Sequence, residues 1–477
     1  MAQPLQPGGG CAIAATAAAL PAPETAEGWP ATQDLRAWLG LLASRGQLGV
    51  VSREVDSRFQ LAGLLTKLDG RAAAMFERVA GATMPVVGNT VPGRPELALA
   101  IGCDVPELAE TYGRACAAPV PFRRLSRDDA PVLAHRIEGD APLDALPIPV
   151  HHEKDGGRYL SAGVVVSRDP VAGATNLSIN RLQAVGPAEL RALVLPGRLR
   201  RIVADAEAAG HPIDLAICLG VDPTVTMASQ ARSPREVDEL ELCGALRGSP
   251  LPVVETPELG LPVPARAEIV IEGRMRPGER APEGPFGEFP RTYGPAAPGH
   301  VVDVLAVWHR ADPIFQTILS AGREHLLIGA IPREADLLRR LRELNAGVRA
   351  LRMTEGGTCR FHLVVSVADS RPGLPVNLML GAFTANPVLK QVVVVDDDVD
   401  PFDDEQVEWA IATRVQADRD VLVIPGASGS TLDPSARSGI TAKMGIDATV
   451  PPGGEEDHAR MRVPGIEDLQ VADWVEG

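Results

Sequence analysis

The segment from Glu283 to Glu288 constrains this chain more than any other, because its sequence Glu-Gly-Pro-Phe-Gly-Glu excludes a regular helix. Proline has no backbone donor and a fixed φ, and the glycines allow a tight, exposed backbone path. Both carboxylates can therefore point into one cleft from a rigid loop. Acid–base chemistry requires two carboxyls whose surroundings push their pKa values apart. An arbitrary pair of glutamates at this spacing is usually a solvated acidic turn. The neighbouring segments must therefore decide between such a turn and a catalytic pair.

The overall composition is that of a globular protein and excludes several functions. The chain has 477 residues, 45% hydrophobic and 23% charged, which is enough for two or three domains. Its net charge of −16 predicts neither a nucleic-acid partner nor an anionic membrane surface. The six cysteines form no CxxC pair, which favours a reducing cytoplasm over a disulfide framework or a zinc site. No apolar run is long enough to span a membrane.

Hydrophobic patterns predict a mixed α/β fold with a leader and three domains. We expect a disordered, Ala- and Pro-rich leader over 1–27 and an N-terminal α/β domain over 28–125, whose first helix Thr32 would cap. Widely spaced β-branched runs predict a mixed barrel or sheet with inserted helices over 126–315. A βαβ rhythm predicts a separate C-terminal α/β domain over 316–477.

The expected elements follow from the same patterns. The expected strands are 162–167, 215–219, 267–273, 301–308, 361–367, 392–395 and 421–424. The expected helices are 233–246, 324–345, 377–383 and 404–414. The glycine-rich stretch 426–439, followed by Lys443-Met444-Gly445, predicts a flexible lid. The pair His151-His152 is interpreted as structural.

Two further segments could place polar groups beside the Glu pair. Arg181 ends the segment Asn176-Leu177-Ser178-Ile179-Asn180-Arg181, where a guanidinium can bind a carboxylate and an amide oxygen can ligate a cation. An Arg held between two glutamates lowers the pKa of its partner, while a desolvated second glutamate keeps its proton. Glu239 precedes the small residues Cys243-Gly244-Ala245, which indicate close helix packing, so its carboxylate can face inward.

The acidic run Asp396-Asp397-Asp398-Val399-Asp400 leaves two interpretations open. Clustered carboxylates suit a hard divalent cation. Acids at the end of a strand, followed by acids that favour the positive end of a helix dipole, explain the same run without a metal. The second interpretation is the more common.

Taken in this order, these segments resemble the UbiD family of reversible decarboxylases, which use prenylated FMN. The resemblance covers about 149–450 and depends mainly on the Glu283–Glu288 segment joined to the Asn176–Arg181 segment. It implies an N-terminal α/β domain, a central flavin-binding split β-barrel with inserted helices, and a C-terminal α/β domain that forms a homodimer. Shorter matching segments are 155–157, 220–223, 244–246, 394–398, 412–414 and 443–449.

The resemblance also implies roles for individual residues. Glu288 would donate the proton after CO₂ loss, and Arg181 would orient the substrate carboxylate and pair with Glu283. The implied cofactor-binding residues are Asn176, Arg181, Gln183, Ser229 and Glu239. Of these, Asn176 and Glu239 would also ligate the divalent metal, Mn²⁺ or Mg²⁺, that holds the cofactor phosphate, with K⁺ nearby.

One position departs from the family pattern. The third ligand of that metal is normally a His eighteen residues after the catalytic Arg, and position 199 here is Leu. Leucine cannot ligate a hard cation. A water, a shifted metal or Arg198 remain as alternatives for the phosphate clamp.

The resemblance implies a cytoplasmic carboxy-lyase that decarboxylates an α,β-unsaturated or (hetero)aromatic acid without oxidation. Side chains offer no electron sink for CO₂ loss, so the cofactor, supplied by a flavin prenyltransferase, must carry that step. Richness in Ala, Arg and Pro suggests a GC-rich genome and a comparison with antibiotic polyketide pathways, such as that of the tautomycetin-pathway decarboxylase. Two alternatives stay open: a catalytically silent flavin-binding homologue, motivated by Leu199, and a metal enzyme built on Asp396–Asp400.

Overall fold

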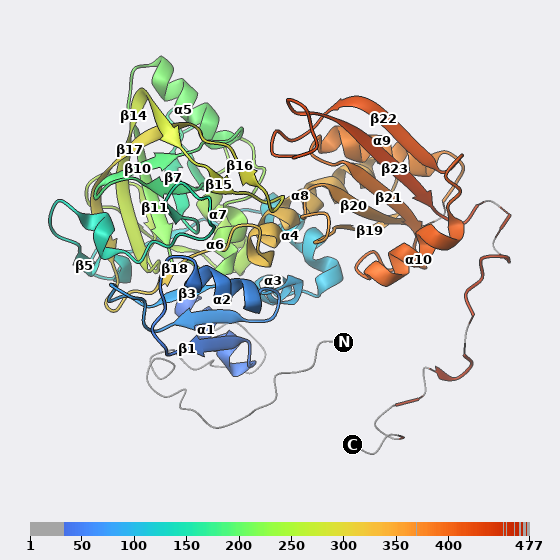
Figure 1. Ribbon diagram of the computed structural model, residues 1–477, viewed down its shortest axis with the longest axis horizontal. Helices are drawn as coiled ribbons and strands as arrows, with labels where there is room; N and C mark the ends of the chain where they lie inside the picture. Colours follow the sequence, from blue (N-terminus) through green and yellow to red (C-terminus); the bar gives the residue numbers. More distant parts are fainter. Residues whose placement is uncertain are drawn as a thin grey trace.

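The chain has a mixed α/β fold, as predicted, in three regions (Figure 1). The computed structural model describes residues 33–368, 370–451, 453–454, 456–461, 463–466, 469–470 and 474. The predicted leader and the predicted cap Thr32 lie outside these residues. Helix α1 (Leu35–Ser44) is capped by Asp34, whose carboxylate accepts a hydrogen bond from the Ala37 amide at 2.9 Å.

The N-terminal region is a small sheet with helices packed against it. The sheet has the order β1-β2-β3-β18, so a strand that follows the central region in sequence completes it. The apolar face of α1, with Trp38 fully buried, packs on Met75 and Val87 of this sheet. Its elements are α1, β1 (Leu48–Val51), α2 (Gln60–Leu68), β2 (Ala73–Phe76), β3 (Val86–Gly88), α3 (Arg94–Ile101), the 3₁₀ helix η2 (Val105–Glu107), α4 (Leu108–Ala117) and β18 (Phe315–Gln316).

The central region is built on a curled nine-stranded sheet. Its order is β6-β9-β10-β17-β14-β11-β7-β8, with β5 paired to β17. The strands are β5 (His135–Arg136), β6 (Arg158–Leu160), β7 (Val164–Arg168), β8 (Thr175–Ile179), β9 (Leu182–Ala184), β10 (Glu189–Ala192), β11 (Ile213–Leu219), β14 (Ile269–Glu283) and β17 (Ala297–His309). All four strands predicted for this region are present.

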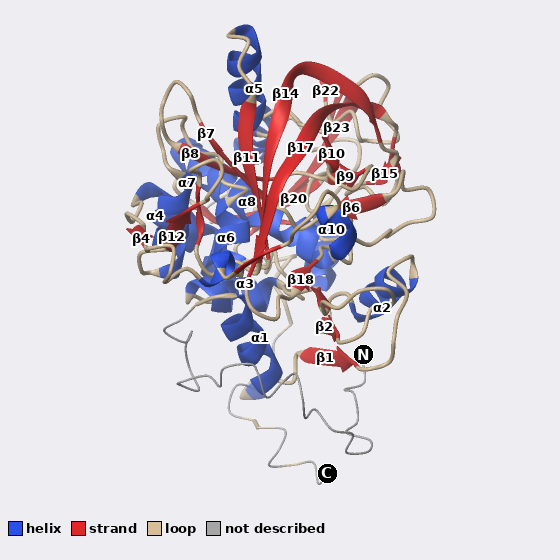
Figure 2. Cartoon of the chain, turned by 90° about the vertical axis from the view of Figure 1, so that its left-hand side faces the viewer, coloured by secondary structure: helices blue, strands red, loops and turns tan. Residues whose placement is uncertain are grey.

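Strands β14 and β17 form a long antiparallel hairpin that runs through the sheet (Figure 2). The register shifts between Met275 and Arg280, which bends the hairpin. Beyond this bulge the pairing resumes and ends at Glu283 opposite Ala297. The hairpin therefore delivers the first carboxylate of the Glu pair from a paired strand and not from a free loop.

Smaller elements flank this sheet. They are β4 (Arg123–Arg124), η3 (Pro131–Leu133), η4 (Pro142–Ala145), α5 (Arg198–Ala208), α6 (Pro223–Ala228), α7 (Glu239–Arg247), β12 (Pro252–Glu255), β13 (Pro262–Pro264), β15 (Phe286–Gly287) and β16 (Tyr293–Gly294). The helix predicted from residue 233 begins only at Glu239, because Asp238 caps it by accepting a bond from the Leu240 amide. Close packing of α7 is confirmed, since a Cβ on Gly244 would lie 2.8 Å from the Val120 carbonyl oxygen.

The C-terminal region is a five-stranded sheet of order β19-β20-β21-β23-β22, joined to the central region by the long helix α8 (Figure 1). Its elements are α8 (Arg323–Leu344), β19 (Val348–Met353), β20 (His362–Val367), α9 (Leu374–Ala385), β21 (Gln391–Asp396), α10 (Asp404–Arg414), β22 (Val421–Ser428) and β23 (Ile440–Ala448). The predicted lid is wrong at both ends: residues 426–428 belong to β22, and Lys443, Met444 and Gly445 belong to β23, which lies inside the sheet between β21 and β22.

The five cysteines that the structure describes are all free thiols. Within the same residues, no helix combines the length and the apolar character needed to cross a membrane.

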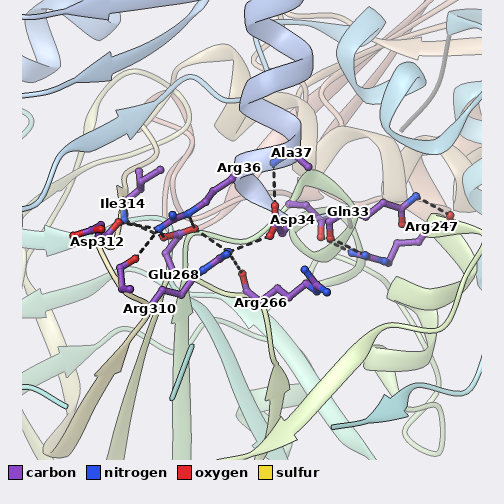
Figure 3. A network of polar contacts seen from close by, with 12 residues as sticks. Gln33, Asp34, Arg36, Ala37, Arg247, Arg266, Glu268, Arg310, Asp312 and Ile314 are labelled. Carbon is purple, nitrogen blue, oxygen red and sulfur yellow. Dashed lines mark hydrogen bonds and ion pairs between the residues drawn. The ribbon is translucent and has the colours of Figure 1, made fainter. Parts of the chain in front are cut away.

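A buried polar network fastens α1 to the central sheet (Figure 3). Glu268 is fully buried and accepts two hydrogen bonds from Arg36, each 2.9 Å long. It also accepts bonds from Arg310 at 3.2 Å and from the Ile314 amide at 3.1 Å. Arg310 reaches Asp34, the cap of α1, at 3.1 Å. The orientation of α1 is therefore fixed by Glu268 and Arg310, which lie next to the ends of the hairpin β14–β17.

Replacing the carboxylate at the centre of this network should destabilise the fold. In Glu268→Ala, two arginines lose their buried partner, so we expect the free energy of unfolding to fall by about 3–5 kcal/mol. Thermal denaturation followed by circular dichroism would report this as a lower Tm. The control Arg274→Ala removes an exposed pair with Asp214 and should cost under about 1 kcal/mol. Equal Tm values for both variants would contradict this assignment.

Candidate active site

Arg181 lies between the two glutamates that the sequence singles out. Its Nη2 donates to Glu283 Oε2 at 2.7 Å, and its Nη1 pairs with Glu288 Oε1. Glu283 is fully buried and Glu288 is 8% exposed. Arg181 follows β8, Glu283 ends β14 more than a hundred residues later, and Glu288 lies in the loop beyond it.

The charges of this triad do not balance, because one guanidinium serves two carboxyls. Burial raises the pKa of Glu288, and the nearby charge of Glu283 adds to the effect while Arg181 opposes it. Glu288 therefore binds a proton more readily than an ordinary glutamate. Glu283 Oε1 and Arg181 Nε are buried and lack a hydrogen-bond partner among the described residues. Such groups remain available to a bound molecule.

The loop between the glutamates is held by hydrogen bonds on both sides. Gln183 accepts from the Gly284 amide at 3.1 Å and donates to the Gly156 carbonyl at 2.7 Å. The Gly156 amide donates to the Pro285 carbonyl at 2.7 Å, across a cis Gly284–Pro285 peptide bond. Contrary to the expectation of an exposed path, the loop is half-buried or buried throughout. Its rigidity comes from these contacts as well as from proline.

Asp155 secures the far end of the same loop. Its Oδ1 accepts a hydrogen bond from the Gly287 amide at 2.9 Å, while Oδ2 accepts from the His152 amide at 2.9 Å. The segment 155–157 thus contacts the loop through a carboxylate and through a glycine. His151 is buried and its Nε2 lies 3.0 Å from Thr317 Oγ1, which agrees with a structural role.

Two cavities open on either side of Glu288. The smaller, of about 120 Å³, places Arg181 and Glu288 against apolar side chains of the barrel and of α8. Its other lining residues are Ser161, Ile179, Asn180, Leu193, Leu195, Phe286, Ile318, Ser320, His325 and Ile328. The larger, of about 420 Å³, lies toward α2 and shares Glu288 and Ser320 with it. The Glu288 carboxyl can therefore contact a molecule bound in either cavity.

His325 is a polar group of the smaller cavity that the sequence analysis missed. Burial lowers its pKa to about 3, and the charges of Arg360 and Arg333 act in the same direction. Its Nδ1 accepts a hydrogen bond from the Ala321 amide at 3.0 Å, so the neutral ring carries its proton on Nε2. The residue lies within the expected helix 324–345, and no motif in the sequence marks it.

Of the two predicted metal ligands, Glu239 already has both carboxylate oxygens in hydrogen bonds. Asn176 is buried on β8, and Glu239 begins α7. Glu239 Oε2 accepts from the Leu177 amide at 2.6 Å, and Oε1 accepts from the Ser233 hydroxyl at 2.6 Å. Leu199 is buried in the apolar core and brings no ligand. These residues do not fit a divalent cation.

Ser229 and the acidic run have local partners. The Ser229 hydroxyl donates to the Thr226 carbonyl at 2.7 Å. Arg414 binds Asp398 at 2.7 Å and Asp396 at 3.3 Å, which neutralises much of the acidic charge. No group of three or more His, Cys, Asp or Glu that could hold a metal occurs in the part of the chain that the structure describes.

Comparisons with known proteins agree with this geometry. The three domains of the 3-octaprenyl-4-hydroxybenzoate carboxy-lyase family match in order: the N-terminal domain over 39–116, the Rift-related domain over 123–323 and the C-terminal domain over 326–448. These matches span most of the chain. The protein belongs to the UbiD family and is a carboxy-lyase of that class.

Characterised relatives and solved structures place the chain among decarboxylases. It is 35% identical over 413 residues to an anhydromevalonate phosphate decarboxylase of Methanothermobacter thermautotrophicus, covering 86% of this chain and 96% of the relative. A phenolic acid decarboxylase of Bacillus subtilis is 33% identical over 456 residues, covering 88% and 93%. The UbiD-class enzyme HmfF from Pelotomaculum thermopropionicum, solved with FMN, matches with a TM-score of 0.90 and 45% identity, covering 93% and 100%.

The packing of Gly156 against the loop generates a test of the site. A Cβ at this position would lie 2.4 Å from the Gly284 carbonyl oxygen, so Gly156→Ala must displace the loop that carries both glutamates. We expect turnover to fall by about 100-fold, as for an ångström-scale misplacement of reacting groups. The control Gly356→Ala meets no atom within 4 Å and should leave turnover unchanged. Full activity of Gly156→Ala would show that the loop position is unimportant.

Proposed function

We propose that this protein is a prenylated-FMN-dependent, non-oxidative decarboxylase of an α,β-unsaturated or (hetero)aromatic carboxylic acid. The observation that carries the proposal is the single guanidinium of Arg181 bound to both Glu283 and Glu288 beside an apolar cavity. The unpartnered Arg181 Nε and Glu283 Oε1 suit a site that receives a polar molecule. The solved relatives include one with FMN and one, an evolved dimeric form of HmfF, with prFMN.

The substrate's carboxylate would be oriented by Arg181. A guanidinium presents several donors in one plane, and Arg181 has one that is buried and free. Phe286, whose ring centroid lies 5.2 Å from the Arg181 Cζ, limits how the guanidinium can turn. When bound, the flavin supplies the electron sink that no side chain offers. Loss of CO₂ breaks one carbon–carbon bond and leaves its electron pair on the rest of the molecule.

Glu288 would then return a proton to that carbon. Its raised pKa keeps more of the protonated form than an ordinary glutamate has at the same pH. Glu283, fully buried and 2.7 Å from Arg181, holds the guanidinium in place. Glu288 must regain a proton before the next turnover. The larger cavity, which Glu288 also lines, gives that proton a route.

The size and lining of the smaller cavity support an unsaturated or aromatic substrate. About 120 Å³ is close to the roughly 150 Å³ of a cavity that binds benzene, and apolar side chains form most of its wall. The named activities of the relatives, on a phenolic acid and on a phosphorylated unsaturated acid, belong to the same class of chemistry. A role in a polyketide pathway, including that of tautomycetin, stays a prediction from composition and resemblance.

Two alternatives have less support. A silent flavin-binding homologue would not need the Arg181 arrangement, although Leu199 keeps this hypothesis open. A metal enzyme at Asp396–Asp400 would have to displace Arg414, which already binds Asp398 and Asp396. The contacts of Arg181 favour the decarboxylase over both.

Several expectations stay predictions. These are the flavin prenyltransferase as cofactor supplier, the cytoplasmic location, K⁺ near the phosphate and the homodimer. For the homodimer, Val423, Ile440 and Met444 form an exposed apolar patch on β22 and β23 that would suit self-association. Binding of a divalent Mn²⁺ or Mg²⁺ is disfavoured, because both carboxylate oxygens of Glu239 already accept hydrogen bonds.

Replacing the ionisable carboxyl of Glu288 with an amide tests the proposal directly. In Glu288→Gln we expect turnover of an accepted acid to fall by about 10²–10⁴-fold, because the amide cannot donate as an acid, while FMN affinity stays unchanged. In the wild type, kcat should fall as the pH rises through the raised pKa of Glu288, since only the protonated form donates. Steady-state rates across pH and FMN fluorescence titration measure both effects.

The matched control for this substitution is Glu279→Gln. Glu279 lies on β14, the strand that ends at Glu283, is exposed beside Arg276, and should not affect turnover. A Glu288→Gln variant with the rate of Glu279→Gln would remove Glu288 from the reaction.

A further inference from the structure

Arg198 occupies the space beside Glu239 where the family resemblance calls for a divalent metal. Its Nη1 lies 3.4 Å from Glu239 Oε1, and both side chains are at least nine-tenths buried. Glu239 is the residue to which the resemblance assigns the role of a metal ligand. A guanidinium at this distance already neutralises that carboxylate.

The neighbouring contacts fix Arg198 in this position. Its Nη1 donates to the Val237 carbonyl and its Nη2 to the Arg235 carbonyl, both at 2.7 Å. The side chain thus ties the start of α5 to the loop that precedes α7. Position 199, by contrast, packs its leucine into the core and leaves no ligand for a cation.

One donor of Arg198 remains free. Its Nε is buried and has no hydrogen-bond partner among the described residues. The carboxylate oxygens of Glu239 are occupied by Leu177, Ser233 and Arg198 itself, so they have little left to offer a cation. A buried N–H without an acceptor is instead suited to an anionic oxygen.

We propose that Arg198 replaces the divalent metal in this protein, so that the flavin phosphate is held by a guanidinium and its binding needs no metal ion. The inference rests on the proposed function, because it takes the anion to be the phosphate of the flavin cofactor. The alternative is an arginine that only joins the start of α5 to the loop before α7. That arginine would affect stability but not flavin affinity.

Titration of the full-length protein with FMN, followed by flavin fluorescence, separates these cases. We expect the wild-type Kd for FMN to be the same in EDTA and in added Mn²⁺, and metal analysis of the purified protein to find no stoichiometric divalent ion. Arg198→Ala should weaken FMN binding by about 10- to 100-fold, as expected for loss of one charged hydrogen bond. Arg198→Lys should recover part of the affinity.

The control is Arg201→Ala, on the exposed face of the same helix, which should bind FMN as the wild type does. FMN binding by the wild type that requires Mn²⁺ would overturn the inference and leave the proposed function intact. Unchanged FMN affinity in Arg198→Ala would also overturn it and would assign Arg198 a purely structural role. No FMN binding with or without Mn²⁺ would overturn both this inference and the flavin-dependent function.

Discussion

The ion pairs of Arg181 with Glu283 and Glu288 are the interaction on which our proposed function depends. A single positive charge, buried with two carboxyls, cannot stabilise both of them as anions equally. The fully buried Glu283 keeps its ion pair, and burial pushes the pKa of Glu288 upward. Two residues of the same type thus lie in different surroundings, and Glu288 is the one whose pKa is raised.

Much of the central region serves to keep that geometry. The hairpin β14–β17 carries Glu283 to the end of its pairing, and Gln183 and the segment 155–157 bind the loop up to Glu288. Helix α8 contributes His325 and Ile328 to the cavity, so the C-terminal region completes a site whose charged groups come from the barrel. The Glu268 network fastens the N-terminal helix to the same sheet. All three regions thus contribute to the site or to its support.

The sequence predicted which charged residues lie together better than it predicted what surrounds them. Glu283, Arg181 and Glu288 were predictable because proline and glycine fix a non-helical loop and because the motifs match a family. The apolar strands were predictable from their β-branched residues. His325 was not, since it lies in an ordinary helical pattern and joins the cavity only through tertiary packing. The start of α7 was placed too early because Asp238, and not the hydrophobic pattern, decides where the helix begins. Strand β23 was mistaken for a lid because its lysine and glycine are typical of a loop. Its pairing with β21 depends on residues far away in the sequence.

The most direct test of the central claim is to identify the cofactor that the protein retains. The chain would be co-expressed with a flavin prenyltransferase, and the absorbance spectrum and mass of the bound molecule would be measured after purification. Our account predicts prenylated FMN, bound next to Arg181 and Glu288. Purification of a folded protein with no flavin under these conditions would contradict it, because the triad would then lack the electron sink that decarboxylation requires.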